Sequence, residues 1–176
     1  CNAGSHVPKP SIEGGLADIF TVKPIERLIE ARGRLIDHLG RHAPHIVIVG
    51  GGPSAAEVAG NVWALATTTG RHTPRITVCA GSAFMSTFPA SVRQKISGIL
   101  NRRGITIREG VYAKSILTDT VTLDNGETLP ADFIFLALGV TPSSIFGDSG
   151  IDTGPDGGLR VNRFLQSTHH PDIFGG

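Results

Sequence analysis

Six residues in the first third of the chain, Gly50-Gly51-Gly52-Pro53-Ser54-Ala55, have the types and spacing of a phosphate-binding turn. They fit the pattern G-x-G-x-x-A, in which Gly50 permits a tight turn, Gly52 lets the backbone approach a pyrophosphate, and Ala55 lets a helix pack closely on a strand. The pyrophosphate would lie at the N-terminus of that helix, where unpaired N–H groups and the helix dipole favour anions. Because a single match is a weak signal, a glycine-rich turn without a ligand is the alternative.

The elements expected on either side of this turn favour the phosphate-binding interpretation. A continuously apolar, β-branched run from Ile46 to Val49 predicts a strand that is buried on both faces of a parallel sheet. A helix is expected over residues 53–68 and a further strand over Arg75–Cys79, so that the three elements complete a βαβ unit. This is the context that a dinucleotide-binding fingerprint requires.

The end of the second strand departs from that fingerprint. An acidic residue is expected there to bind the adenosine ribose, but the sequence reads Cys79-Ala80-Gly81-Ser82. No arginine that could bind a 2′-phosphate follows closely, the nearest being Arg93. The choice between NADH and NADPH is therefore open. Cys79 is either part of the coenzyme site or a buried strand residue, which is the commoner place for a lone cysteine.

The remaining elements predict the fold class. An amphipathic helix is expected between Pro24 and Gly40, and another helix is expected to begin at a capping box formed by Ser91 and Gln94. Short strands are expected over residues 106–108, 113–117, 120–124 and 133–138, with an Asn125-Gly126 hairpin turn, and in the segment GLRVN near the C-terminus. We expect a Rossmann-like three-layer α/β domain with a central parallel sheet and a small antiparallel β-meander.

Composition argues against several classes of protein. Of the 176 residues, 40% are hydrophobic and 18% are charged, and the formal net charge of +1 indicates neither disorder nor a nucleic-acid partner. Two cysteines are too few for a disulfide scaffold or a Cys-rich zinc site. No apolar run approaches the roughly 20 residues of a membrane span. A cytoplasmic location is the expectation.

Two further segments have residue types that could carry chemistry. Gly147-Asp148-Ser149-Gly150 looks like a serine-protease nucleophile segment, but a catalytic triad is recognised by geometry rather than by a tetrapeptide. His169-His170 are adjacent and belong to no zinc-binding pattern, which favours a solvated turn. We therefore predict no metal site and no catalytic acid, base or nucleophile in this chain.

Four ordered segments resemble one known family. GGGPSAAEVAG resembles the NAD(P)H-binding segment of the FAD-dependent pyridine nucleotide-disulphide oxidoreductases, especially the branch of the type II NADH dehydrogenases. VTLDNGETLPADFIFLALGVTP resembles that family's hairpin, return strand and A-x-G-x-x-P crossover. NAGSHVPKPSIEG is similar to the segment that leaves the FAD domain, and GLRVNRFLQSTHHPDIFGG is similar to the segment that leads back to it. The resemblance spans nearly the whole chain.

The resemblance implies cofactors and residue roles. NAD(H) or NADP(H) would be bound by this chain, and FAD would be bound largely outside it. Glu57 would face the nicotinamide carboxamide, or would only interact favourably with the helix dipole. Ser54 would bind phosphate or help to cap the helix, and Gly139 would line the cleft in a turn that needs a positive φ. The predicted cofactor-binding residues are Gly50, Gly51, Gly52, Pro53, Ser54, Ala55, Glu57, Cys79 and Gly139.

The resemblance also implies a domain organisation. The family has a second glycine fingerprint for FAD, which this chain lacks, so the expectation is a central domain of a longer flavoprotein. Residues 1–20 would cross from the FAD domain, residues 21–140 would form the NAD(P)H-binding domain, and residues 141–176 would return to the FAD domain. The expected partners are the FAD domain of the same polypeptide and an unknown electron acceptor. The parent protein is expected in the cytoplasm or peripheral to a membrane, with a homodimer as one expected form.

Three functions are compatible with these features. The first is an NAD(P)H-binding domain that presents the nicotinamide for hydride transfer to FAD, and that is inactive by itself. The second is a non-catalytic nucleotide-binding or regulatory module, in which the departure at Cys79 marks weakened coenzyme binding. The third is a methyltransferase-like Rossmann domain, against which the hairpin and the terminal segment argue.

Overall fold

The computed structural model describes residues 3–6, 18–69, 72–117 and 119–175, and the chain divides into two compact units. The larger unit is Lys9–Gly139, and the smaller unit combines the two ends of the chain, Cys1–Pro8 and Val140–Gly176. Among the described residues, no helix has both the length and the apolar character needed to cross a membrane.

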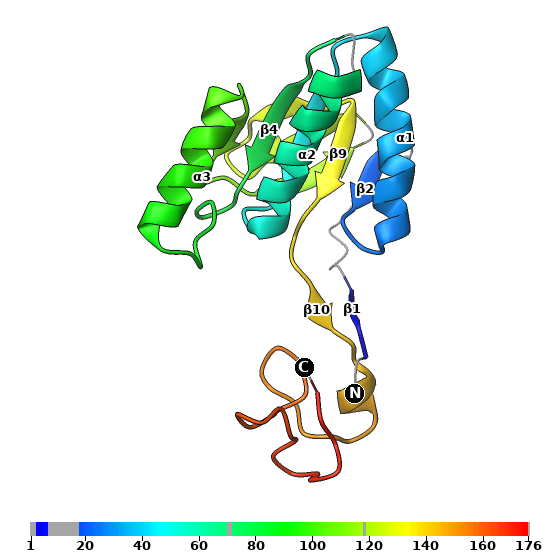
Figure 1. The fold of residues 1–176 in the computed structure, drawn as a ribbon, viewed down its shortest axis with the longest axis vertical. Coiled ribbons are helices and arrows are strands. Elements are labelled where there is room, and N and C mark those ends of the chain that lie inside the picture. Colours follow the sequence, from blue (N-terminus) through cyan, green and yellow to red (C-terminus); the bar gives the residue numbers. More distant parts are fainter. Residues whose placement is uncertain (1–2, 7–17, 70–71, 118, 176) are drawn as a thin grey trace. The chain divides into compact units, whose positions relative to one another are not determined.

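A five-stranded parallel sheet is the centre of the larger unit (Figure 1). Its strands in spatial order are β2 (Ile19–Thr21), β9 (Phe133–Leu136), β3 (His45–Val49), β4 (Arg75–Cys79) and β5 (Thr106–Arg108). β9 comes late in the sequence but pairs with both β2 and β3. Because all pairs are parallel, the carboxyl ends of β9, β3 and β4 form one row at one edge of the sheet.

Three helices cover one face of this sheet, and a small antiparallel sheet covers the other face. The helices are α1 (Ile25–Arg41), α2 (Pro53–Thr69) and α3 (Ala90–Arg102), and Figure 1 shows them side by side over the strands. The antiparallel sheet contains β6 (Ala113–Leu117), β7 (Thr120–Leu123) and β8 (Thr128–Pro130). The predicted Rossmann-like three-layer fold with a β-meander is confirmed.

The side-chain alternation of β3 explains these layers. Ile46 and Ile48 belong to the core beneath the helices, whereas Val47 and Val49 belong to the core beneath the meander. Successive residues of a strand point to opposite faces, so a strand with both faces covered must be apolar at every position. The uninterrupted apolar run of β3 is therefore a direct consequence of its central place.

Two local expectations differ from the structure. α3 begins at Ala90 after Pro89, and no side chain forms a capping hydrogen bond there, so the predicted Ser91 and Gln94 capping box is wrong. Pro89 fixes the backbone at the helix entry without a side-chain acceptor. The edge strand β2 was not expected, because three residues are too few to show a period in the sequence.

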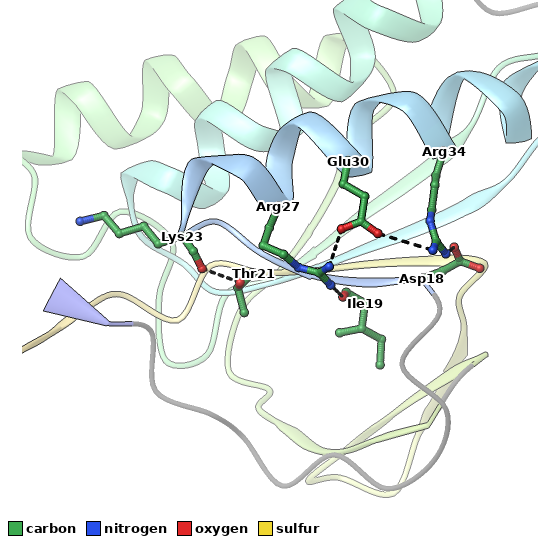
Figure 2. A network of polar contacts seen from close by, with 7 residues as sticks. All are labelled: Asp18, Ile19, Thr21, Lys23, Arg27, Glu30 and Arg34. Atoms are coloured by element: carbon green, nitrogen blue, oxygen red, sulfur yellow. Dashed lines mark hydrogen bonds and ion pairs between the residues drawn. The ribbon is translucent and has the colours of Figure 1, made fainter.

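A polar network attaches α1 to the β2 edge of the sheet (Figure 2). The Arg27 guanidinium donates to the backbone oxygen of Ile19 at 3.2 Å and pairs with Glu30. The Arg34 guanidinium lies 3.3 Å from Asp18 and 3.5 Å from Glu30. A short edge strand is thus held by side chains of the helix that follows it, as well as by its ladder with β9.

The smaller unit is built from short pieces. β1 (Ser5–His6) pairs antiparallel with β10 (Thr141–Pro142), and α4 (Ile145–Asp148) is a single turn. In the segment GLRVN, Leu159 and Val161 each form one isolated bridge, so the strand expected there is wrong. Hydrogen bonds within a turn hold this segment instead of a strand ladder. Asn162 Oδ1 accepts hydrogen bonds from the backbone N–H groups of Phe164 and Gln166.

Candidate functional site

The glycine turn after β3 is wedged between the ends of the two neighbouring strands. Gly50 has φ +138°, and a β-carbon there would lie 2.1 Å from the backbone oxygen of Ala137, after β9. A β-carbon at Gly51 would lie 2.3 Å from the backbone oxygen of Ala80, after β4. Both distances are far below van der Waals contact. Glycine is therefore required at both positions for packing, and the requirement at Gly51 was not foreseen.

Gly52 differs from the two glycines before it. A β-carbon at Gly52 would meet no atom within 4 Å, so the space beside its backbone is open. Gly52 leads directly into α2, whose first residues Pro53 and Ser54 are exposed, while Ala55 is fully buried against the sheet. Helix N-termini carry unpaired N–H groups and partial positive charge. The turn thus combines a packed base with an open backbone face at a helix N-terminus.

The end of β4 places Cys79 in the core and not on the surface. Its side chain is 2% exposed and belongs to the core beneath the meander. Burial raises the pKa of the Cys79 thiol to about 11, while Arg108 opposes that rise and Glu127 adds to it. A neutral buried thiol is not positioned to bond a ribose. Of the two interpretations of Cys79, the structure favours the strand residue.

Long-range contacts hold the loop that follows β4. The backbone N–H of Met85 donates to the Gly51 oxygen at 2.6 Å, and the backbone N–H of Phe84 donates to Glu109 Oε1 at 2.6 Å. Arg93 Nε donates to the Phe84 oxygen at 3.0 Å, and its guanidinium lies 3.6 Å from Glu109 Oε1. Arg93, the arginine nearest to the end of β4 in the sequence, is therefore engaged in fixing this loop.

Glu109 and Met85 were not singled out in the sequence. Glu109 follows β5 directly, and the carboxyl ends of parallel strands meet at one edge, where ligands bind in open α/β sheets. A carboxylate directly after a predicted strand was the feature of the sequence that could have identified Glu109. Met85 carries no comparable signal, since it acts through its backbone at φ 53°.

The last two predicted site residues lie on different elements. Glu57 is exposed on α2, one turn after the start of the helix. Gly139 is exposed three residues after β9 and has φ +83°, as a turn with positive φ requires. The carboxyl edge of the sheet thus carries the glycine turn, residues 79–82 and the turn that contains Gly139, with Glu57 on the helix leaving that edge.

Neither of two cavities in the larger unit is lined by the glycine turn, by residues 79–82 or by Gly139. A cavity of about 330 Å³ includes His45 and Arg75, the first residues of β3 and β4, and a cavity of about 440 Å³ lies between α1 and α2. Within the described ranges, no group of three or more His, Cys, Asp or Glu side chains could hold a metal ion. His169 lies in the smaller unit, with Nδ1 3.0 Å from Asp152.

Known structures share this fold. An engineered water-forming NADPH oxidase bound to NADPH, a mutant of the Lactobacillus brevis enzyme, matches with a TM-score of 0.73 and 25% identity over 97% of this chain and 36% of its own. The reduced CoADR-RHD protein of Bacillus anthracis matches with a TM-score of 0.77 and 18% identity over 97% of this chain and 30% of its own.

Sequence comparison gives the family. The ferredoxin–NAD(+) reductase component of the p-cumate 2,3-dioxygenase system of Pseudomonas putida is 35% identical over 134 residues, which are 73% of this chain and 31% of the relative. An internal alternative NAD(P)H-ubiquinone oxidoreductase of Arabidopsis thaliana is 24% identical over 97% of this chain and 37% of its own. The chain spans about a third of the length of such relatives. The family model of the pyridine nucleotide-disulphide oxidoreductases matches residues 3–176, and the chain belongs to this family.

Proposed function

We propose that residues 21–140 are the NAD(P)H-binding domain of a flavin-dependent oxidoreductase. The observation that carries this proposal is the turn at the end of β3, where Gly50 and Gly51 pack against neighbouring backbone and Gly52 faces open space at the start of α2. A pyrophosphate needs this combination of a close backbone approach and a helix N-terminus. The Pseudomonas putida relative is named for NAD(+), and the oxidase structure is bound to NADPH.

Each residue of the proposed site has a distinct task. The backbone of Gly52 and the exposed Ser54 hydroxyl would hold the pyrophosphate, and Ala55 would keep α2 close to the sheet. The Glu57 carboxylate would face the nicotinamide carboxamide, and the turn at Gly139 would line the same cleft. At the end of β4, backbone and the exposed Ser82, and not the Cys79 thiol, would face the ribose.

FAD would be bound by the rest of a parent polypeptide. Residues 1–20 and 141–176 would connect this domain to the FAD domain, which is supported by the pairing of β1 with β10 within one unit formed by both chain ends. The bound cofactors supply the hydride chemistry, and this chain binds and orients the nicotinamide. The electron acceptor lies outside the chain. Relatives are named for ferredoxin and for ubiquinone.

A titration of the 176-residue chain with NADH and with NADPH tests this proposal. We expect saturable binding of at least one coenzyme, and binding about 10- to 100-fold weaker in Gly52→Val, because the valine side chain fills the space proposed for the pyrophosphate. Gly33→Val is the matched control, since Gly33 also has open space beside it but lies in α1. Equal coenzyme affinity in Gly52→Val and Gly33→Val would contradict the pyrophosphate assignment.

The missing carboxylate at the end of β4 favours one alternative, a non-catalytic nucleotide-binding or regulatory module with weakened coenzyme binding. The same titration separates the two functions. Absence of saturable binding of both coenzymes by the folded chain would support the regulatory module and exclude the coenzyme domain.

A further inference from the structure

An exposed aromatic ring lies beside the end of β4. Tyr112, the only tyrosine of the chain, is 54% exposed. A β-carbon at Gly81 would lie 3.0 Å from Tyr112 Cε1, so the ring packs directly on the glycine backbone. Gly81 has φ +67° and follows Cys79 by two residues. The ring therefore covers the turn at which the second strand of the βαβ unit ends.

Backbone contacts fix Tyr112 from two sides. The N–H of Tyr112 donates to Asp124 Oδ1 at 3.0 Å, and the N–H of Asp124 donates to the Tyr112 oxygen at 2.9 Å. On the other side, Gly81 donates to the Val111 oxygen at 3.1 Å and accepts from the N–H of Gly110 at 2.6 Å. The meander and the loop after β4 thus fix the backbone at Tyr112, and the ring itself packs on Gly81.

We propose that the Tyr112 ring is a stacking platform for the adenine of the coenzyme. The inference rests on the proposed function and extends it to a residue outside the glycine fingerprint. In a dinucleotide-binding βαβ unit the adenosine ribose lies at the end of the second strand, here β4, and the exposed Tyr112 ring lies at that end. Single exposed aromatic residues are common on protein surfaces, but this ring is both pre-positioned and placed at the ribose end.

The proposed contact explains how adenosine is held without an acidic residue at the end of β4. A stacked ring contacts the base and not the ribose hydroxyls, so it acts equally on NADH and NADPH. It also contributes nothing to a ligand without adenine. These two properties distinguish stacking from a general effect on the fold.

The experiment measures binding of NADH, NADPH, ADP and nicotinamide mononucleotide to the 176-residue chain by calorimetry, with far-ultraviolet circular dichroism to compare folding. In Tyr112→Ala we expect about tenfold weaker binding of NADH, NADPH and ADP alike, because base–aromatic stacking is lost. Tyr112→Phe keeps the ring and should bind all three within about twofold of the unchanged chain. Nicotinamide mononucleotide should not discriminate between the variants.

The outcomes separate this inference from the proposed function. If the unchanged chain binds coenzyme and Tyr112→Ala binds it equally well, the stacking role is overturned and the coenzyme domain stands. If Tyr112→Ala weakens NADPH but not NADH, the ring acts at the 2′-phosphate and the stacking role is likewise overturned. If the folded chain binds neither coenzyme nor ADP, the proposed function is overturned, and the stacking role is overturned with it.

Discussion

The ends of β3 and β4 are neighbours at one edge of the sheet, yet they are built in different ways. After β3, the backbone of Gly50 and Gly51 lies directly against the backbone of neighbouring segments, and these contacts leave no room for a side chain. After β4, the loop is fixed by side chains from distant segments, Glu109 beyond β5 and Arg93 on α3. Both ends depend on contacts with other segments, but the residues that must be glycine after β3 are consecutive, whereas the side chains that hold the loop after β4 are far from it in the sequence.

This difference explains why one end has a motif and the other does not. A turn whose backbone touches the backbone of its neighbours tolerates only glycine, so this requirement appears as a run of glycines in the sequence. A loop held by remote side chains distributes its requirement over residues that are far apart in the sequence. A sequence motif can therefore identify the end of β3 and miss the end of β4, although specific contacts hold both.

The largest effect is expected from Gly50→Ala, which breaks the packed turn. The added β-carbon meets the Ala137 oxygen at 2.1 Å and the residue must keep φ +138°, so we expect the free energy of unfolding to fall by about 3 kcal/mol or more. Urea unfolding followed by circular dichroism measures this change.

Gly104→Ala is the matched control for the strain that an alanine causes at a positive φ. Gly104 has φ +77° but no atom within 4 Å of an added β-carbon, so only conformational strain is expected, about 1 kcal/mol. A loss in Gly50→Ala no larger than that in Gly104→Ala would show that the contact with Ala137 does not specify the turn.

Local patterns predicted the main strands and the glycine turn, although the local Ser91–Gln94 capping box was wrong, and residues that act through distant contacts were missed. β4 is found over the predicted residues Arg75–Cys79, because an apolar strand between turns has a clear pattern. The burial of Cys79 beneath the meander was left open, since the sequence does not show which layer covers that face. The loop anchor Glu109 was missed because its role depends on a contact 25 residues away with Phe84.

An effect of intermediate size on the free energy of unfolding is expected from the ionisation of Cys79 at high pH. This effect tests whether the Cys79 side chain, at the end of β4, belongs to the core. Burial raises the pKa of the thiol from 9.0 to about 11, so the folded state favours the neutral form. The unfolded chain loses this proton first as the pH rises. The stabilisation is complete below pH 9.0 and is lost between pH 9.0 and about 11, at about 1.4 kcal/mol per pH unit.

Cys79→Ala provides the comparison, because every other titrating group is shared with the unchanged chain. We expect the difference in unfolding free energy between the two proteins to be constant from pH 6 to 8 and to shrink above pH 9.0, as measured by urea unfolding at each pH. A difference that stays constant up to pH 10.5 would indicate a solvated thiol and reopen a place for Cys79 in the coenzyme site.

The smallest effect is expected from Glu109→Ala, which removes the remote anchor of the β4 loop. The Phe84 N–H and the Arg93 guanidinium lose their shared acceptor, and we expect a loss of about 1 kcal/mol in unfolding free energy, because the pair is half exposed and screened by solvent. Coenzyme binding should weaken about three- to tenfold, since the loop beside Gly51 is then held by Met85 without Glu109.

Glu30→Ala is the control, because it removes an exposed ion pair on α1. It should alter stability by a similar or smaller amount and leave coenzyme affinity unchanged. If both variants left coenzyme affinity unchanged, the end of β4 would not depend on its remote anchor, and the contrast with the end of β3 would be one of sequence pattern and not of function.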